Sequence, residues 1–179
     1  MSQQTIFHLM SDLTKQEGIS CVLIGGFAVN CYGVTRQTAD VDFLITKKDF
    51  DKIIILLEKS GYTTDLIQEN FAQLKSKYQS FMNVDFMFID SGTLSKVLKE
   101  VRKIRIGKQE FLVPCLNHLI ALKLHSIKYN QKIRLMRDLP DIINLIRINK
   151  VNVKAETFRK LCFKFGTEEI YKKILEALE

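Results

Sequence analysis

Three aspartates lie within or at the start of apolar runs that are typical of β-strands. Asp40 and Asp42 stand one residue apart in the run 40–45 (DVDFLI), and Asp85 interrupts the run 84–89 (VDFMFI). A carboxylate on a hydrophobic strand is costly unless a cation lies beside it. Divalent metal ions meet that need, and sites with two metal ions are a common device of phosphoryl chemistry. The three aspartates therefore predict a metal site that acts on phosphates.

The alternation of side chains along a strand places these carboxylates on one side of the predicted sheet. Thr38, Asp40 and Asp42 share one strand face, whereas the other face carries Ala39, Val41, Phe43 and Ile45. Asp85 points away from its apolar neighbours in the same manner. If the two strands are neighbours in one sheet, Asp85 reaches the other two aspartates. Carboxylate oxygens, water and substrate phosphates are the ligands that Mg²⁺ prefers.

A pair of glycines ends an earlier apolar run. Residues 19–24 (ISCVLI) predict a buried strand, Gly25 and Gly26 follow, and residues 27–32 predict a short helix. A glycine turn between a strand and a helix exposes backbone N–H groups that favour phosphate. A Gly-Gly pair alone is more often only a tight turn, and an Asp-x-Asp triplet is often a solvated strand end. The prediction therefore depends on the order in which the three motifs occur together.

This ordered set of motifs resembles the DNA polymerase beta-like nucleotidyltransferase superfamily. Its form is most similar to small prokaryotic members, namely the AbiEii-type toxins of toxin–antitoxin pairs and the minimal nucleotidyltransferases. The motifs that carry the resemblance span residues 19–90. The resemblance implies a metal-dependent transfer of a nucleotidyl group from a nucleoside triphosphate to an acceptor hydroxyl. An antitoxin partner or a homodimer is compatible with it.

The resemblance also implies a role for each motif residue. Gly25 and Gly26 are expected to hold the triphosphate. Asp40, Asp42 and Asp85 are expected to be the catalytic carboxylates and to bind two Mg²⁺ or Mn²⁺ ions, with Asp85 also helping to activate the acceptor hydroxyl.

Three further residues are candidates for binding the nucleotide. Arg36 and Thr38 precede the first aspartate and are expected to contact the phosphates or the base. Lys123 falls on the apolar stripe of a helix predicted over 115–129, four residues after Leu119. A lysine there either extends its ammonium group to water or contacts an anion. The resemblance favours a triphosphate oxygen as that anion.

The segment around Asp138 departs from the family pattern. Arg137 stands before it where the similar family segment has a lysine, and Pro140 follows it. Because proline suits the first turn of a helix, we predict a helix over 139–149. Asp138 is then expected to cap that helix or to pair with Lys123 or an arginine.

The remaining pattern predicts an α/β protein with a mixed-sheet nucleotidyltransferase fold followed by a C-terminal helical bundle. Residues 1–113 are expected to form the α/β domain, and residues 114–179 a helical region packed on it. Besides the segments named above, the predicted helices span 3–17, 47–59, 93–101, 154–165 and 167–178, and the predicted strands span 62–67, 71–77, 104–106 and 110–113.

Composition restricts the class of protein and its partners. The chain has 179 residues, 46% of them hydrophobic, without an apolar run that would cross a membrane, so a soluble cytoplasmic protein without a membrane partner is expected. Its four cysteines lack zinc-site spacing and predict reduced thiols. The net charge of +7, gathered in residues 96–108 and 123–137, favours triphosphates and RNA as partners, although either basic run is also compatible with a solvated surface.

Several alternatives stay open at this point. The acceptor can be a tRNA end, a protein hydroxyl, or an aminoglycoside or lincosamide antibiotic, and the positive charge favours RNA. A sugar-nucleotide glycosyltransferase also uses Asp-x-Asp, but it does not need the glycine pair. A module that binds nucleotides without catalysis is a third class, against which stands the presence of all three carboxylates.

Overall fold

The computed structural model describes residues 5–78 and 81–179, which divide into two compact units. The first unit comprises Met1–Ala28 and Gln37–Pro114, and the second comprises Val29–Arg36 and Cys115–Glu179. The sequence predicted a division after residue 113 but did not predict that residues 29–36 group with the helices of the second unit.

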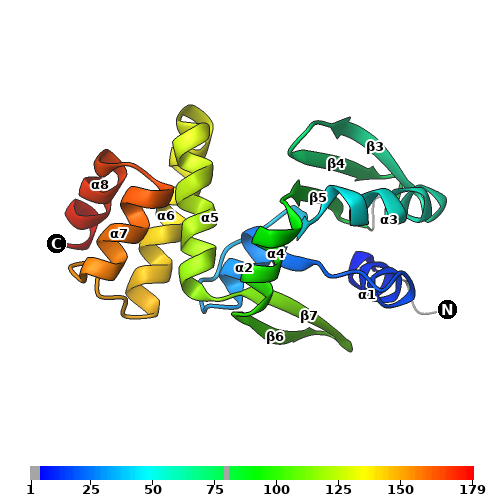
Figure 1. Cartoon of the computed structure of the whole chain (residues 1–179), viewed down its shortest axis with the longest axis horizontal. Helices are drawn as coiled ribbons and strands as arrows, with labels where there is room; N and C mark the ends of the chain where they lie inside the picture. The colour runs from blue at the N-terminus through cyan, green and yellow to red at the C-terminus, as the bar shows by residue number, and fades with distance from the viewer. Residues whose placement is uncertain (1–4, 79–80) are drawn as a thin grey trace. The chain divides into compact units, whose positions relative to one another are not determined.

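A five-stranded mixed sheet is the basis of the first unit (Figure 1). Its strands follow the spatial order β1-β2-β5-β4-β3, in which β2 and β5 run parallel and every other neighbouring pair runs antiparallel. The bounds are β1 (Val22–Ile24), β2 (Asp40–Ile45), β3 (Tyr62–Ile67), β4 (Phe71–Ser76) and β5 (Asn83–Phe88). The predicted mixed sheet is confirmed.

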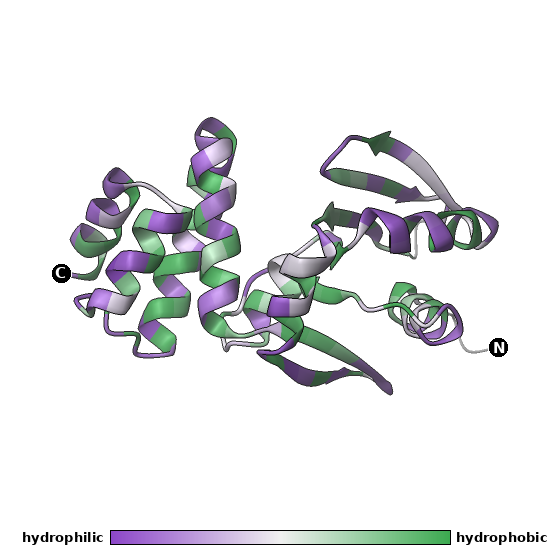
Figure 2. Cartoon of the chain, viewed as in Figure 1, coloured by the Kyte–Doolittle hydropathy of each residue, from purple (hydrophilic) through white to green (hydrophobic). Residues whose placement is uncertain are grey.

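Four helices and a separate hairpin complete the elements that begin in this unit. The helices are α1 (Ile6–Gln16), α2 (Gly25–Asn30), α3 (Lys47–Lys59) and α4 (Ser91–Leu98), and the hairpin pairs β6 (Val101–Ile106) with β7 (Gln109–Pro114). Helix α3 begins where the Thr46 hydroxyl accepts from the Asp49 N–H, an N-cap that satisfies one of the free backbone donors. The alternation of purple and green along α3 in Figure 2 shows its amphipathic character.

Aromatic side chains form the core beneath one face of the sheet. Phe43 of β2 stacks on Phe86 of β5 with ring centroids 5.9 Å apart. Phe50 of α3 packs on Phe86 and Phe88, at 5.1 and 4.9 Å. Because Phe43 and Phe86 alternate with the aspartates along their strands, the burial of these rings fixes the face on which the carboxylates lie.

The second unit is helical and has its own apolar core. It contains α5 (Leu116–Tyr129), α6 (Gln131–Ile148), α7 (Glu156–Phe165) and α8 (Glu168–Leu178). Its fully buried side chains include Leu124, Ile142, Cys162 and Ile174. Burial raises the pKa of the Cys162 thiol to about 12, so this thiol stays protonated at neutral pH.

Helix α6 begins eight residues earlier than the sequence predicted, at Gln131, so Pro140 lies inside the helix and Asp138 does not cap it. The exposed position of Pro140 and the burial of Asp138, Asp141 and Ile142 show why the helix continues. Packing of this buried face overrides the local preference against a helix before proline. Strand β2 also begins later than predicted, so Thr38 lies just before it.

No helix among residues 5–78 and 81–179 is long and apolar enough to cross a membrane.

Replacement of Phe43 by alanine should reduce the free energy of unfolding by about 3–5 kcal/mol, because it opens a cavity beneath the sheet. Denaturant-induced unfolding followed by circular dichroism measures the effect. Ile55→Ala is the matched control, since Ile55 is 57% exposed and its loss should change stability by less than about 0.5 kcal/mol. Equal losses in the two variants would contradict the assigned core.

Candidate active site

The parallel pairing of β2 with β5 brings the three aspartates together on one face of the sheet. Asp42 pairs directly with Asp85, and Asp40 pairs with Asn83. The Cα atoms of paired residues on neighbouring strands lie about 5 Å apart. All three aspartates are half-buried, whereas Val41 between the first two is fully buried on the opposite face. The strand arrangement that the sequence required is therefore present.

Gln73 is a further member of this group that the sequence analysis missed. It lies opposite Asp85 in the antiparallel pair β4–β5, and its Nε2 donates to Asp85 Oδ2 at 3.0 Å. The strand pattern of β4 carried the signal, since Gln73 stands between the buried residues Ala72 and Leu74. The hydrogen bond restricts the orientation of the Asp85 carboxylate.

Gly25 lies directly against the Asp42 carboxylate. It has a φ of +63°, and a Cβ added there would lie 1.9 Å from Asp42 Oδ2 and 2.4 Å from Asp42 Cγ. The pairing of Ile24 with Asp42 across β1 and β2 explains this approach, because Gly25 is the next residue after the strand. Any side chain at position 25 would displace the carboxylate, and the positive φ disfavours one as well.

The second glycine has an equivalent contact with Thr38. A Cβ on Gly26 would lie 2.7 Å from both Thr38 Cβ and Thr38 Oγ1. The Thr38 hydroxyl donates to the backbone carbonyl of Asp40 at 3.0 Å. The structure thus brings Gly26 and Thr38 to the start of the strand that carries the first two aspartates.

The donor atoms gathered here are suited to a hard divalent cation. Three carboxylates and the Gln73 amide present oxygen atoms, which Mg²⁺ and Mn²⁺ prefer over nitrogen and sulfur. Two carboxylates on adjacent strands repel each other unless a cation lies between them. The chemistry of this donor set fits metal ions held by Asp40, Asp42 and Asp85.

Arg36 and Lys123 belong to the second unit, where they form a buried charge network. Lys123 Nζ of α5 lies 2.8 Å from Asp138 Oδ1 and 2.7 Å from Asp141 Oδ2, both on α6. Arg36 Nη1 lies 2.5 Å from the same Oδ2 of Asp141. Lys123, Asp138 and Asp141 are at most 6% exposed. The lysine on the apolar stripe of its helix therefore has two anionic partners within its own unit.

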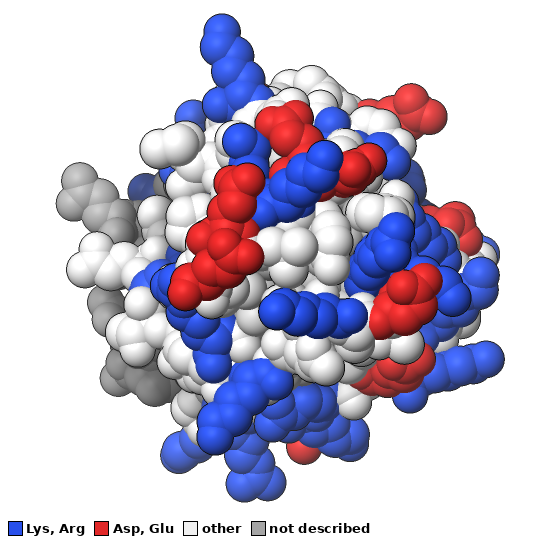
Figure 3. Space-filling model, turned by 90° about the vertical axis from the view of Figure 1, so that its left-hand side faces the viewer, with Lys and Arg blue, Asp and Glu red and all other residues white. Residues whose placement is uncertain are grey.

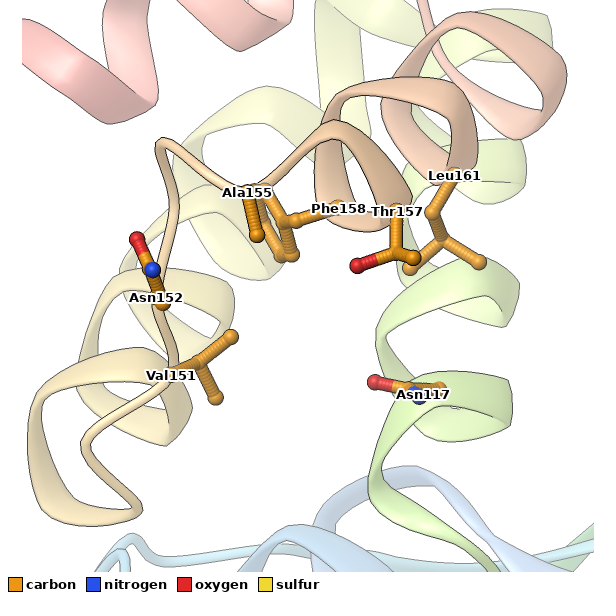
Figure 4. A pocket seen from close by; sticks show the side chains of 7 residues that line it. All are labelled: Asn117, Val151, Asn152, Ala155, Thr157, Phe158 and Leu161. Carbon is orange, nitrogen blue, oxygen red and sulfur yellow. The ribbon is translucent and has the colours of Figure 1, made fainter.

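A pocket of about 180 Å³ lies in the second unit, between the start of α5 and the segment that leads into α7 (Figure 4). Its lining residues are Asn117, Val151, Asn152, Ala155, Thr157, Phe158 and Leu161. The lining contains no charged side chain, so this pocket does not suit a triphosphate or a metal ion.

Comparison with known proteins identifies the family. The family model described as "Uncharacterised nucleotidyltransferase" matches residues 1–178. The chain belongs to this family. The predicted superfamily is thereby confirmed, and the protein is an enzyme of the nucleotidyltransferase class. No curated protein matches the chain.

Solved structures show that the nucleotidyltransferase shares its fold with proteins of very different sequence. A nucleotidyltransferase-like antigenic protein from Paracoccidioides brasiliensis is 16% identical, with a TM-score of 0.58 over 96% of this chain and 91% of that one. The antibiotic-resistance factor ANT(2'')-Ia is 11% identical, with a TM-score of 0.65 over 97% of this chain and 96% of that one. The lincosamide antibiotic adenylyltransferase LnuA, with lincomycin bound, is 16% identical, with a TM-score of 0.57 over 83% and 98%. These likenesses confirm the predicted fold class.

Substitution of Gly25 by alanine in the nucleotidyltransferase should displace the Asp42 carboxylate and weaken Mn²⁺ binding at least about tenfold, because it moves a carboxylate that is expected to hold the ion. Gly18→Ala is the matched control, because Gly18 has a φ of +60° and nothing within 4 Å of an added Cβ. Both variants should lose about 1–2 kcal/mol of stability from the strained backbone. Electron paramagnetic resonance of free Mn²⁺ measures binding, and equal affinities in the two variants would contradict the contact.

Replacement of Lys123 by methionine should lower the stability of the nucleotidyltransferase by about 3–5 kcal/mol, because it leaves two buried carboxylates with Arg36 as their remaining cation. Lys172→Met removes an exposed lysine that lies 3.0 Å from Glu168 and should change stability by less than about 1 kcal/mol. Denaturant-induced unfolding measures both. A neutral Lys123→Met would show that the network contributes no net stability.

Proposed function

We propose that this nucleotidyltransferase transfers a nucleoside monophosphate from a nucleoside triphosphate to a hydroxyl acceptor, with two Mg²⁺ or Mn²⁺ ions held by Asp40, Asp42 and Asp85. The observation that carries the proposal is the register of β2 and β5, which pairs Asp42 with Asp85 on the accessible face of the sheet. The contact of Gly25 with Asp42 brings the glycine pair, at the start of α2, to the same place. A carboxylate group beside a glycine turn combines a metal site with a phosphate site.

The side chains have separate tasks in the proposed reaction. The metal ions, when bound, supply charge that lowers the pKa of the acceptor hydroxyl and offsets charge on the departing pyrophosphate. The acceptor oxygen forms a bond to the α-phosphorus while the bond from that phosphorus to pyrophosphate breaks. Asp85, oriented by Gln73, is the carboxylate that we assign to the acceptor side. Gly25 and Gly26 would direct backbone N–H groups at the triphosphate.

Arg36, Thr38 and Lys123 are further proposed contacts of the nucleotide. Thr38 lies beside Gly26, which supports a position close to the triphosphate. An ammonium group has three N–H donors, and Asp138 and Asp141 occupy two of those of Lys123. The third N–H of Lys123 would donate to a phosphate oxygen. Arg36, whose side chain is 32% exposed, would add a second cation.

We favour RNA or a protein as the acceptor and the cytoplasm as the location. The net charge of +7 supports a polyanionic acceptor, since a cationic substrate would be repelled. A toxin–antitoxin role, with an antitoxin partner or a homodimer, follows from the resemblance of the motifs to AbiEii-type toxins. The second candidate is antibiotic adenylylation, which the fold shared with ANT(2'')-Ia and the lincosamide adenylyltransferase LnuA supports.

Transfer of labelled nucleotide tests the function. The protein is incubated with each α-labelled nucleoside triphosphate, Mg²⁺ or Mn²⁺, and separate pools of tRNA, total protein and antibiotics. Label should move to one pool, and Asp42→Ala should reduce the rate at least about a hundredfold, since metal ions supply several kcal/mol of transition-state stabilisation. Stability should be unchanged or higher, because one of several repelling carboxylates is removed.

Asp65→Ala is the matched control for this experiment. Asp65 lies on β3 in an exposed ion pair with Lys75, so its loss should leave transfer unchanged. Full activity in Asp42→Ala would overturn the site. Triphosphate binding that needs Mg²⁺, without label in any pool, would instead indicate a module that binds nucleotides without transfer.

A further inference from the structure

The turn between α5 and α6 carries a basic segment, residues 125–137, which we name the α5–α6 tip. The sequence of the tip contains four lysine and arginine residues and neither aspartate nor glutamate. All four cations are exposed. They are Lys128, Lys132, Arg134 and Arg137. The four positive charges of the tip therefore equal more than half of the chain's net charge of +7.

Several cations elsewhere in the second unit have a carboxylate partner, whereas, in the described part of the chain, none of the four cations of the tip has one. On α8, Lys172 lies 3.0 Å from Glu168, and Lys173 lies 3.5 Å from Glu169. On the face drawn in Figure 3, red carboxylates lie beside blue cations in the upper and central part, while the lower edge is mostly blue. Within residues 5–78 and 81–179, no carboxylate forms an ion pair with any cation of the tip. The tip therefore has the charge to attract a polyanion.

The tip also exposes flat and apolar side chains among its cations. Tyr129 is 72% exposed, Ile133 60% and Met136 80%. The ring centroids of His125 and Tyr129 lie 4.5 Å apart, with the ring planes tilted by 41°. Lys128 Nζ lies 5.8 Å from the centroid of the Tyr129 ring. Partial burial, together with the charge of Lys128, lowers the pKa of His125, so its ring is neutral at neutral pH. An aromatic platform between cations is the arrangement that binds unpaired bases and their phosphates.

We propose that the α5–α6 tip binds single-stranded RNA, with Tyr129 stacking on a base and the four cations contacting phosphates. The proposal deepens the proposed function, because the bound RNA would be the molecule that carries the acceptor hydroxyl. The binding itself needs neither metal nor nucleotide. An anionic membrane surface would use the same cations together with Ile133 and Met136. The exposed ring of Tyr129 favours a base, since its face offers a flat surface for stacking.

Fluorescence anisotropy with a labelled 20-nucleotide RNA of mixed sequence tests the proposal, using the full chain without metal. Tyr129→Ala should raise Kd about tenfold, the effect expected for one stacked base. Lys132→Glu/Arg134→Glu should raise Kd further and should reduce the slope of log Kd against log salt by about 1.4, or about 0.7 for each phosphate that the variant no longer neutralises. Denaturant-induced unfolding verifies that each variant is folded.

Matched controls come from exposed residues of the same unit. Phe163→Ala removes an aromatic ring on α7 that is 42% exposed, and Lys154→Glu/Lys164→Glu makes the same change of net charge away from the tip. The controls should bind RNA within about twofold of the natural chain. Equal losses of affinity in tip and control variants would overturn the proposal, because they would indicate a general effect of charge. Absence of RNA binding at 50 mM salt would overturn it too.

Two further comparisons separate the possible failures. Vesicles with 30% phosphatidylserine in phosphatidylcholine test the membrane alternative, and vesicle binding that the tip variants abolish while RNA binding persists would overturn the proposal. Asp42→Ala should bind RNA like the natural chain even though its nucleotidyl transfer is strongly reduced. RNA binding through the tip without transfer to RNA would support the tip site while the proposed acceptor fails. Transfer to protein or antibiotic without RNA binding would overturn the tip site while the proposed nucleotidyl transfer stands.

Discussion

The close approach of Gly25 to Asp42 is the constraint on which the arrangement of the first unit depends. Gly25, the first residue of α2, has no side chain, so the carboxylate of Asp42 on the neighbouring strand lies against its backbone. Strand β1 must pair with β2 in the observed register for this to occur, and β2 must pair with β5 for Asp85 to lie beside Asp42. The aromatic core then holds that register, because a slip of one residue would bury the aspartates and expose Phe43 and Phe86. The same packing that stabilises the sheet therefore selects the face that carries the chemistry.

The second unit contains a largely buried network of ion pairs. Two cations and two carboxylates form one charge-balanced network, in which Lys123 contacts both carboxylates and Asp141 contacts both cations. Three of the four groups are almost fully buried. Pairs of this kind contribute little net stability compared with apolar packing, but they are costly to break on one side. Their geometric effect is definite, since Arg36 ties the segment 29–36 to α6 while Lys123 ties α5 to α6. The backbone of Arg36 is held in turn by Asn30, whose side chain bonds both its N–H and its carbonyl, at 3.1 and 3.0 Å.

Much of the fold and of the candidate site could be predicted from the sequence because these features have local signals. Alternation of Asp40, Val41 and Asp42 determines the face of a strand, and the glycine pair marks the end of β1, although α2 begins at Gly25 and not at the predicted residue 27. The sequence offered no local signal for the start of α6, where burial of Asp138 and Asp141 against Lys123 outweighs the effect of Pro140. Gln73 was missed for a related reason, since its partner Asp85 is twelve residues away and only strand pairing brings them together. The grouping of residues 29–36 with the helices also depends on long-range contacts, such as that of Asn149 with the Tyr32 carbonyl.

Pro140 has a consequence for the mechanics of α6. Proline has no N–H, so the carbonyl of Met136, four residues earlier, receives no bond from the helix ladder at that point. The first turns of α6 are therefore attached to the remainder of the helix by a weakened backbone. Asp138 lies within this stretch, and its ion pair with Lys123 fastens it to α5 instead. Lys123 of α5 thus holds the first part of α6 in place through Asp138. Because this ion pair is buried, dissolved salt screens it far less than it screens the exposed cations nearby.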